Sequence, residues 1–387
     1  MIDSDQHLYE YRGMWREHID PAQRDDALEL TDDARGNTWL SWQGRVLGVA
    51  DVQDPGETDA IGERRRRERA GLPPLRRYDD VLPRDYWEPT ARKARLAELG
   101  VDEAFLFPNY GLAWERRLDA WSRPALLANL RAWNRWCASV AAEGAGRLHP
   151  VMHLHLGDLA WLESELAGAA RADLQLAMIA PALVDGVPLS HPSLDRAWSL
   201  FVEHGVTPVF HVADQPRPFH DAWYTDGELG GVPVLESIFL WTPAALAATD
   251  LIVNGVFARH PQLRLGIVEL SAVWVPMYLM MLDGGMRFVN RLYGESRTAL
   301  DSPGSEVFKR HVRVSSFAYE LPERIIRQTG GSDLYMCCSD YPHSEGTATP
   351  VADYRGVLDA HAGLRGGNAA FLLAGSPIRY LRIGTSM

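Results

Sequence analysis

The first seven residues, MIDSDQH, place ionisable side chains at alternate positions. If this segment is a strand, Asp3, Asp5 and His7 share one face, because successive side chains of a strand point to opposite faces. Ionisable groups are costly to bury unless something pairs with them. A divalent metal ion would pair with them. A frayed, solvated chain terminus is the alternative, and this segment taken alone favours it.

Other ionisable residues close apolar segments later in the chain. His211 ends TPVFH, Glu269 ends LRLGIVE, and Asp340 follows LYMCCS. Each residue alone is more often a hydrogen-bonded core group than a ligand, but convergence of all of them is hard to explain by chance. Two imidazoles and two carboxylates, from Asp5, His7, His211 and Asp340, suit Zn²⁺ or Mn²⁺ and leave coordination positions for water or substrate.

The elements that position these residues can be read from the apolar pattern. Eight short apolar segments are expected to be strands: 1–7, 103–107, 149–156, 174–179, 207–212, 263–270, 312–317 and 334–339. Helices are expected between them, as at 198–203, 243–257 and 274–292. Apolar strands alternating with helices indicate a parallel sheet covered on both faces.

Eight such units predict an α/β fold, a distorted (β/α)8 TIM barrel over residues 1–387 as one domain. A doubly wound open sheet is the less favoured alternative. In a barrel, the residues that follow the strands form the active-site face. His211, Glu269 and Asp340 would lie there with Asp5 and His7.

A long insertion follows the first strand, and we interpret residues 10–90 as a cap over the barrel mouth. Within it, TWLSWQGRVLGV at 38–49 predicts a hairpin around Gln43 and Gly44. ERRRRER at 63–69, followed by Gly71, Pro73 and Pro74, predicts a polar surface loop.

Composition narrows the class of partner. The chain has 51 acidic and 39 basic residues and a formal charge of −12, which argues against nucleic acid or an anionic membrane as partner. Its three cysteines make no disulfide framework. The sequence indicates no signal peptide and no apolar run long enough to span a membrane. A cytoplasmic protein acting on a small molecule is therefore expected.

The motifs together resemble the amidohydrolase superfamily, specifically the amidohydrolase-related branch that includes aminocarboxymuconate-semialdehyde decarboxylase. The matching residues are Asp5-Gln6-His7, His191 to Asp195 (HPSLD), His211, Trp274-Val275-Pro276 and Ser339 to His343 (SDYPH). The resemblance covers nearly the whole chain. It departs from the family in two places: Asp5 replaces the first His of an HxH motif, and Glu269 replaces the family's strand-six His.

The resemblance implies one divalent metal ion, with Zn²⁺ favoured and Mn²⁺ as the alternative. Binuclear members use a carboxylated Lys on strand four, and segment 174–179 (LQLAMI) has no Lys. The implied ligands are Asp5, His7, His211 and Asp340. Asp340 is also the implied catalytic proton shuttle, and Glu269 is a catalytic base, a further ligand or a structural acid. His155, Asn109 and His343 are the expected substrate-binding residues.

The expected activity is metal-dependent hydrolysis, in which activated water attacks a C–N or C–O bond of a small aromatic or cyclic substrate. Non-oxidative decarboxylation, in which the metal chelates a carboxylate beside a hydroxyl, is the main alternative. A cyclising or hydrating reaction at the same metal is a third. A binding module would require a broken metal site, which only the Glu269 replacement suggests. A homodimer is expected by analogy with the family.

Overall fold

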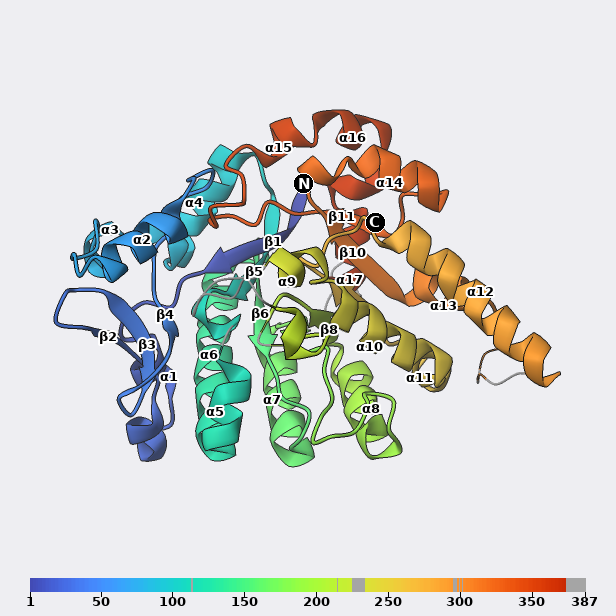
Figure 1. The fold of residues 1–387 in the computed structure, drawn as a ribbon, viewed down its shortest axis with the longest axis horizontal. Coiled ribbons are helices and arrows are strands. Elements are labelled where there is room, and N and C mark those ends of the chain that lie inside the picture. Colours follow the sequence, from blue (N-terminus) through green and yellow to red (C-terminus); the bar gives the residue numbers. More distant parts are fainter. Residues whose placement is uncertain are drawn as a thin grey trace. The chain divides into compact units, whose positions relative to one another are not determined.

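Eight strands form one sheet in the order β1-β5-β6-β7-β8-β9-β10-β11 in this computed structural model. The structure describes residues 1–112, 114–213, 215–224, 234–294, 298, 300 and 302–373. The strands are β1 (Ile2–Leu8), β5 (Glu103–Pro108), β6 (Leu148–His153), β7 (Leu176–Met178), β8 (Thr207–Phe210), β9 (Leu265–Ile267), β10 (Val312–Ser316) and β11 (Tyr335–Cys337). Each overlaps a segment expected to be a strand, and helices alternate with them (Figure 1). The predicted (β/α)8 fold is confirmed.

The chain folds as two compact units. The first contains Met1–Leu154, Arg171–Leu174 and Cys337–Gly356, and the second contains the remaining described residues. In the first unit, β1 pairs in parallel with β5, and β5 is paired in parallel with β6. In the second, β7, β8, β9 and β10 pair in parallel in that order. Within each unit, the carboxyl ends of the strands therefore lie at one edge. The single-domain organisation expected for residues 1–387 stays a prediction.

The first unit surrounds its strands with short helices and one long one. Its helices are α1 (Met14–His18), α2 (Ala60–Arg69), α3 (Tyr78–Val81), α4 (Pro89–Leu99), α5 (Glu115–Trp121), α6 (Arg123–Gly144) and α15 (Pro350–Asp353), with 3-10 helices at Pro21–Asp26, Arg84–Tyr86 and Tyr110–Leu112. Helix α6 begins where the Ser122 hydroxyl accepts the Ala125 N–H. Its Trp133 donates from Nε1 to the carbonyl of Val151 in β6, at 2.9 Å. This contact fixes the helix against the strand.

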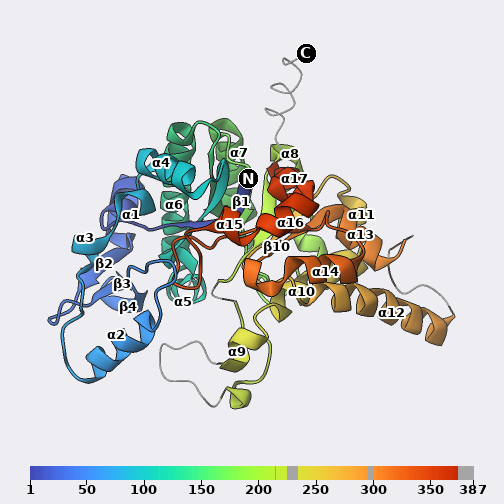
Figure 2. The ribbon, with the colours of Figure 1, turned by 90° about the horizontal axis from the view of Figure 1, so that it is seen from above.

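The second unit contains the longest described helix after α6. Its helices are α7 (Leu159–Ala172), α8 (Asp195–His204), α9 (Val234–Ile238), α10 (Thr242–Val253), α11 (Val256–Arg259), α12 (Val275–Tyr293), α13 (Gly304–His311), α14 (Pro322–Thr329), α16 (Arg355–Ala360) and α17 (Gly367–Leu373), with 3-10 helices at Pro192–Leu194, Asp221–Trp223, Ala318–Glu320 and Ala362–Arg365. Helix α12 packs on α13 and α14 (Figure 2). The helices expected at 198–203 and 274–292 are confirmed. The single helix expected at 243–257 is wrong, because Gly255 adopts a left-handed φ of 72° between α10 and α11.

The insertion after β1 contains a second, antiparallel sheet. It consists of β2 (Glu29–Asp32), β3 (Thr38–Trp42) and β4 (Arg45–Val49). Gln43 and Gly44 connect β3 to β4 with positive φ values of 47° and 75°, which a two-residue type I′ turn requires. The predicted hairpin is confirmed. The function of residues 10–90 as a cap stays a prediction.

The surface loop expected at residues 63–69 is wrong, because these residues belong to α2. Glu and Arg are good helix formers, and their alternation here places opposite charges one turn apart. Arg66 lies 2.8 Å from Glu63 in such a pair. The helix ends at Arg69, and Gly71 follows it with a φ of 69°.

One described segment, Val234–Val253, has the length and mean hydropathy (1.3) of a membrane span, with 39% of it buried. A span of this kind was not expected from the sequence. Buried core helices pass the same test of length and composition. In α10, the side chains of Ala244, Ala248, Leu251 and Ile252 are buried in the protein, which favours a core helix. The absence of a membrane partner stays a prediction.

Candidate metal centre

The strand-one motif and the SDYPH turn lie together in the first unit. His7 N–H donates to the carbonyl of Tyr341 at 2.7 Å, and Asp340 N–H donates to the carbonyl of Asp5 at 2.9 Å. Nε2 of His7 consequently lies 3.2 Å from Oδ1 of Asp340 and 3.5 Å from Oδ1 of Asp5. All three side chains are fully buried. Three of the four expected ligands, from both ends of the chain, thus share one site.

The orientation of His7 is that of a metal ligand. Its Nδ1 lies 3.0 Å from the carbonyl of Pro108, which only an N–H can satisfy. A neutral ring then points the Nε2 lone pair at two carboxylates, so a cation, whether proton or metal, is required there. Burial lowers the pKa of His7, but Asp340 and Asp5 outweigh it and raise that pKa well above its ordinary value.

Asp340 supplies an open carboxylate oxygen to this site. Its Oδ1 lies 2.7 Å from Nδ1 of His343, whereas its Oδ2 is buried and has no hydrogen-bond partner among the described residues. Burial raises the pKa of Asp340, but His343 and His7 overcome that effect and hold it well below the usual range. An ionised carboxylate with an unsatisfied buried oxygen fits a divalent cation. Ligand atoms of His7, Asp340 and His343 all lie within 4.8 Å of one another.

The turn that carries Asp340 is fixed in a strained conformation. Asp340 has a left-handed φ of 54°. Tyr341 donates from its hydroxyl to Asp85 at 2.7 Å. The turn also closes on Gly346: a Cβ there would lie 2.4 Å from the carbonyl oxygen of Asp340. Non-glycine residues in this region of φ persist only where the surroundings enforce them, commonly at functional sites.

In the second unit, His211 and Glu269 repeat the pattern of His7. His211 follows β8 and is fully buried. Its Nδ1 donates to the carbonyl of Val212 at 2.8 Å, and its Nε2 lies 3.1 Å from Oε2 of Glu269. Glu269 has a φ of 57°, and its N–H donates to the Ser315 hydroxyl at 2.9 Å, which joins the ends of β9 and β10. This pair also presents an imidazole lone pair to a carboxylate.

Two expected substrate-binding residues contact each other. Nε2 of His343 lies 2.7 Å from Oδ1 of Asn109, an acceptor that orients the ring towards Asp340. A residue that the sequence interpretation missed holds this loop: Glu10 accepts the N–H groups of Tyr110 and Gly111, each at 2.9 Å. Burial raises the pKa of Glu10 to about 7 despite these N–H groups. Only the position of Glu10, two residues after β1, could have indicated from the sequence that it has a role in the site.

Asp3 does not belong to the metal group. Its carboxylate accepts from Ser339 N–H and from Gln6 Nε2, each at 2.9 Å. The register of β1 against β5 shifts between Asp3 and Gln6, which interrupts the expected alternation. Buried Arg92 donates to Gln6 and to the carbonyl of His7, at 3.1 and 2.7 Å. Asp3, Gln6 and Arg92 thus support the strand behind the ligands, a role that was not predicted for them. Burial raises the pKa of Asp3 to about 6.

His155 lies two residues beyond β6 and is half-buried. Its Nδ1 accepts the N–H of Gly157 at 3.0 Å, within its own loop. Its neighbour along the chain, His153, pairs with Glu115 at 2.9 Å in the core. The role of His155 in substrate binding stays a prediction.

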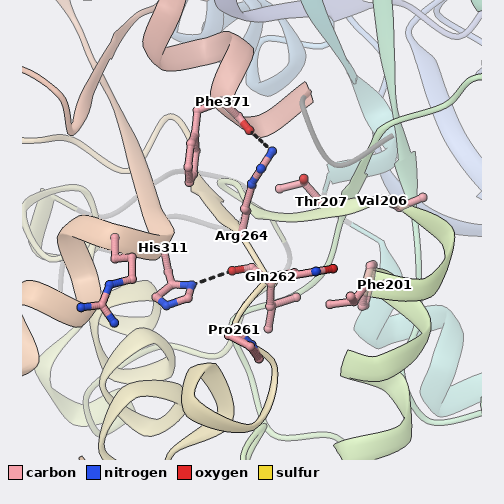
Figure 3. A pocket seen from close by; sticks show the side chains of 12 residues that line it. Phe201, Val206, Thr207, Pro261, Gln262, Arg264, His311 and Phe371 are labelled. Atoms are coloured by element: carbon pink, nitrogen blue, oxygen red, sulfur yellow. Dashed lines mark hydrogen bonds between the residues drawn. The ribbon is translucent and has the colours of Figure 1, made fainter. Parts of the chain in front are cut away.

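A cavity of about 540 Å³ in the second unit lies at the other ends of the strands (Figure 3). Thr207 at the start of β8, Arg264 before β9 and His311 before β10 line it. Figure 3 shows His311 bonded to the chain at Leu263, at 2.8 Å, and Arg264 bonded to Phe371, at 2.6 Å. Because His211 and Glu269 follow the opposite ends of β8 and β9, this cavity is not part of the candidate metal centre.

The fold and these residues define a (β/α)8 protein with carboxylate and imidazole side chains at its strand ends. No protein-family model and no curated protein matches the chain. Solved structures do: one is named an amidohydrolase, and others are named 5-carboxyvanillate decarboxylases.

An amidohydrolase from Mycobacterium avium subsp. paratuberculosis K-10, map2389c, is 23% identical, with a TM-score of 0.77 over 96% of this chain and 98% of its own. A 5-carboxyvanillate decarboxylase from Novosphingobium aromaticivorans, with manganese and 4-hydroxy-3-methoxy-5-nitrobenzoic acid, is 19% identical, with a TM-score of 0.61 over 83% of this chain and 94% of its own. A dihydroxybenzoic acid decarboxylase from Polaromonas sp. JS666, with manganese and 2-nitroresorcinol, is 14% identical, with a TM-score of 0.57 over 96% of both chains. These likenesses show the fold.

Proposed function

We propose that this protein is a metal-dependent, non-oxidative decarboxylase of a hydroxylated aromatic carboxylic acid. The observation that carries the proposal is the ionised, buried carboxylate of Asp340, which lies against His7 on one side and His343 on the other. Structural neighbours named as decarboxylases of aromatic acids support this reaction over the hydrolysis expected from the sequence.

Asp5, His7, His211 and Asp340 are the ligands of the proposed metal ion. The carboxyl ends of the strands in this fold form the face that carries chemistry, and each of these residues lies in or follows a strand end. A set with equal numbers of oxygen and nitrogen ligands suits Mn²⁺ as well as Zn²⁺. We favour Mn²⁺, which three of the neighbours contain. The metal would act as a Lewis acid towards the carboxylate of the substrate and its adjacent hydroxyl oxygen.

Side chains of this protein deliver the proton that the reaction requires. Loss of CO₂ breaks a carbon–carbon bond and leaves its electron pair on the ring carbon, which must receive a proton. Because the pKa of Asp340 is held low, Asp340 does not retain that proton but can transfer it to the substrate. His343 holds the proton and passes it to Asp340. Its Nδ1 lies 2.7 Å from Asp340, and its Nε2 is oriented by Asn109.

Hydrolysis of a C–N or C–O bond is the second candidate, and Glu269 is the residue that favours it. A carboxylate in place of the family's His is a suitable base for removing a proton from water. One structural neighbour is named an amidohydrolase. In that reaction Glu269 would take the proton from water, and Asp340 would return one to the leaving group.

Products distinguish the two reactions. Protein stripped of metal and reloaded with Mn²⁺ or Zn²⁺ should release CO₂ from one or more ortho-hydroxybenzoic acids in a panel, with loss of the aromatic carboxylate. The same preparations should leave aryl amides, esters and lactones intact. Hydrolysis of that second panel with no release of CO₂ would reject decarboxylation in favour of the second candidate. The Asp340→Asn variant, loaded with the same metal, serves as the inactive control.

A further inference from the structure

The cavity of about 540 Å³ in the second unit has no role in the proposed reaction. It lies at the amino ends of β8, β9 and β10, whereas His211 and Glu269 follow the opposite ends of β8 and β9. A cavity of this size holds a small organic molecule when apolar side chains form most of its wall and a few polar groups orient the ligand. The side chains that line it therefore indicate what class of molecule it can bind.

The cavity has an apolar side and a basic side. Figure 3 shows Phe201 and Val206 on one side and His311 on the other. The apolar lining comes from the end of α8 and the residues before β8, and the basic lining comes from Arg264 before β9 and from Arg310 and His311 at the end of α13. Among the described residues that line the cavity, none is Asp or Glu, although the whole chain has a formal charge of −12. Such a lining favours an anionic ligand with an apolar body.

Three polar groups of the lining have no partner in the described part of the chain. Within the residues that the structure describes, the guanidinium of Arg310 forms no ion pair, and the side-chain amide of Gln262 forms no hydrogen bond. Nδ1 of His311 donates to the carbonyl of Leu263 at 2.8 Å, which leaves Nε2 without a described partner. These groups are therefore available to a ligand in the cavity.

Arg264 is held in position by Phe371. Its Nη1 donates to the carbonyl of Phe371 at 2.6 Å, and its guanidinium carbon lies 4.6 Å from the centre of the Phe371 ring. The guanidinium carbon of Arg313 lies 3.8 Å from the centre of the same ring. Contacts of this kind between a cation and an aromatic ring orient the guanidinium without neutralising its charge. Arg264 and Arg313 thus add two positive charges to that of Arg310 at these strand ends.

Stabilisation of helix ends is the alternative role for part of this basic lining. Arg310 and His311 lie in the last turn of α13, where positive charge offsets the partial negative charge of a helix end. Arg264 precedes a strand, so this role does not account for it. At the end of α8, two helix carbonyls already accept the N–H groups of Gly205 and Val206, at 3.2 and 3.0 Å. The positive charge at the cavity therefore exceeds what the two helix ends require.

We propose that this cavity is a binding site for a phosphate monoester with an aromatic or other apolar body. The forked N–H donors of a guanidinium match the oxygen atoms of a phosphate. The two arginines of the lining, Arg264 and Arg310, match the double negative charge of a phosphate monoester better than the single charge of a carboxylate. Nε2 of His311 accepts the proton of a singly ionised phosphate, and Phe201 and Val206 contact the apolar body. The proposal does not depend on the reaction at the metal centre.

Isothermal titration calorimetry of the full chain loaded with Mn²⁺ tests the ligand class. Phenyl phosphate should bind with a dissociation constant below about 1 mM, and benzoate and inorganic phosphate should each bind more weakly by about tenfold or more. Because the cavity and His211 lie at opposite ends of β8, removal of the metal should leave the affinity for phenyl phosphate unchanged. Absence of saturable binding, or binding that metal removal abolishes, would overturn the proposal. Benzoate binding as tight as that of phenyl phosphate would overturn the phosphate assignment.

Two adjacent basic residues of α13 test the position of the site. Arg310→Glu should weaken the binding of phenyl phosphate by about tenfold or more, because it reverses a charge in the lining. Lys309→Glu is the matched control and should leave the dissociation constant unchanged, since Lys309 is also exposed and undergoes the same change of charge but does not line the cavity. Val202→Trp, which fills the apolar side without changing the charge, should abolish binding. Melting temperatures verify that each variant is folded. Equal losses in the two charge variants, or wild-type affinity in Arg310→Glu and in folded Val202→Trp, would overturn the proposal.

Discussion

Nε2 of His211 lies 3.1 Å from the carboxylate of Glu269, and Nε2 of His7 lies 3.2 Å from the carboxylate of Asp340. In each case the opposite ring nitrogen is anchored by a backbone carbonyl, at Val212 and Pro108 respectively. Two imidazoles oriented alike, each with its lone pair towards a carboxylate, are preorganised for a cation.

Removal of either imidazole should therefore remove the metal. We expect His7→Ala and His211→Ala each to weaken metal binding at least 100-fold, measured by elemental analysis after dialysis against a buffered metal. His149→Gln is the control: His149 pairs with Glu103 at the other end of its strand, and its loss should leave the metal content unchanged. Normal metal content in both alanine variants would refute the ligand assignment.

Asp340→Asn should preserve the fold and abolish turnover. Asparagine tolerates the left-handed conformation of this position, so the turn should survive and the melting temperature should change little. Loss of the proton conduit should reduce kcat by about 10² to 10⁴. Metal content measured on the same sample separates a loss of ligand from a loss of proton transfer. A variant that retains more than a tenth of wild-type kcat would exclude Asp340 from the reaction.

Asn109, His343 and Asp340 should behave as one unit in catalysis. Both His343→Gln and Asn109→Ala interrupt the hydrogen-bonded chain, so each should lower kcat, and the double variant should lower it little further. Steady-state kinetics of the two single variants and the double variant measure this coupling. Effects that simply multiply would mean that the two residues act separately.

Glu269→Gln tests the residue that stands where the family resembled by the motifs has a His. If Glu269 is a base, kcat should fall by about 10² or more while metal content stays normal. Glu320→Gln is the nearby control, because Glu320 only accepts backbone and hydroxyl groups at the same strand ends, including Phe317 N–H at 3.1 Å. Unchanged kinetics in Glu269→Gln would assign Glu269 to structure.

Glu10 should make stability depend on pH. Burial raises its folded pKa from 4.5 to about 7, so its contribution to stability is present below pH 4.5 and is lost as pH rises through 7. Relative to Glu10→Gln, the wild type should lose up to about 3 kcal/mol of unfolding free energy between pH 5 and pH 8. Urea denaturation at unit intervals of pH measures the difference. Parallel curves for the two proteins would contradict the shift.

The strands could be predicted because their apolar segments are short and end in polar residues, as at His211 and Asp340. The ligand motifs could be recognised for the same reason. Glu10 and Arg92 could not, because nothing local distinguishes a buried acid or arginine from an exposed one before its partners are known. Helix α2 was missed because Arg and Glu residues form a helix as readily as they solvate a loop, and the pairing of Glu63 with Arg66 depends on the helix itself.

The absence of a side chain at Gly346 constrains how this protein can be re-engineered. Carbonyl oxygens of Asp340 and Ser339 occupy the volume where even a methyl group would go, 2.4 and 2.7 Å from its centre. In a library that randomises residues 339–347, most sequences will therefore carry a side chain at position 346 that displaces the backbone of Ser339 and Asp340. Mutagenesis aimed at new substrates should leave this turn untouched and vary the loop that begins at Asn109, where side chains can change without forcing the carboxylate out of place.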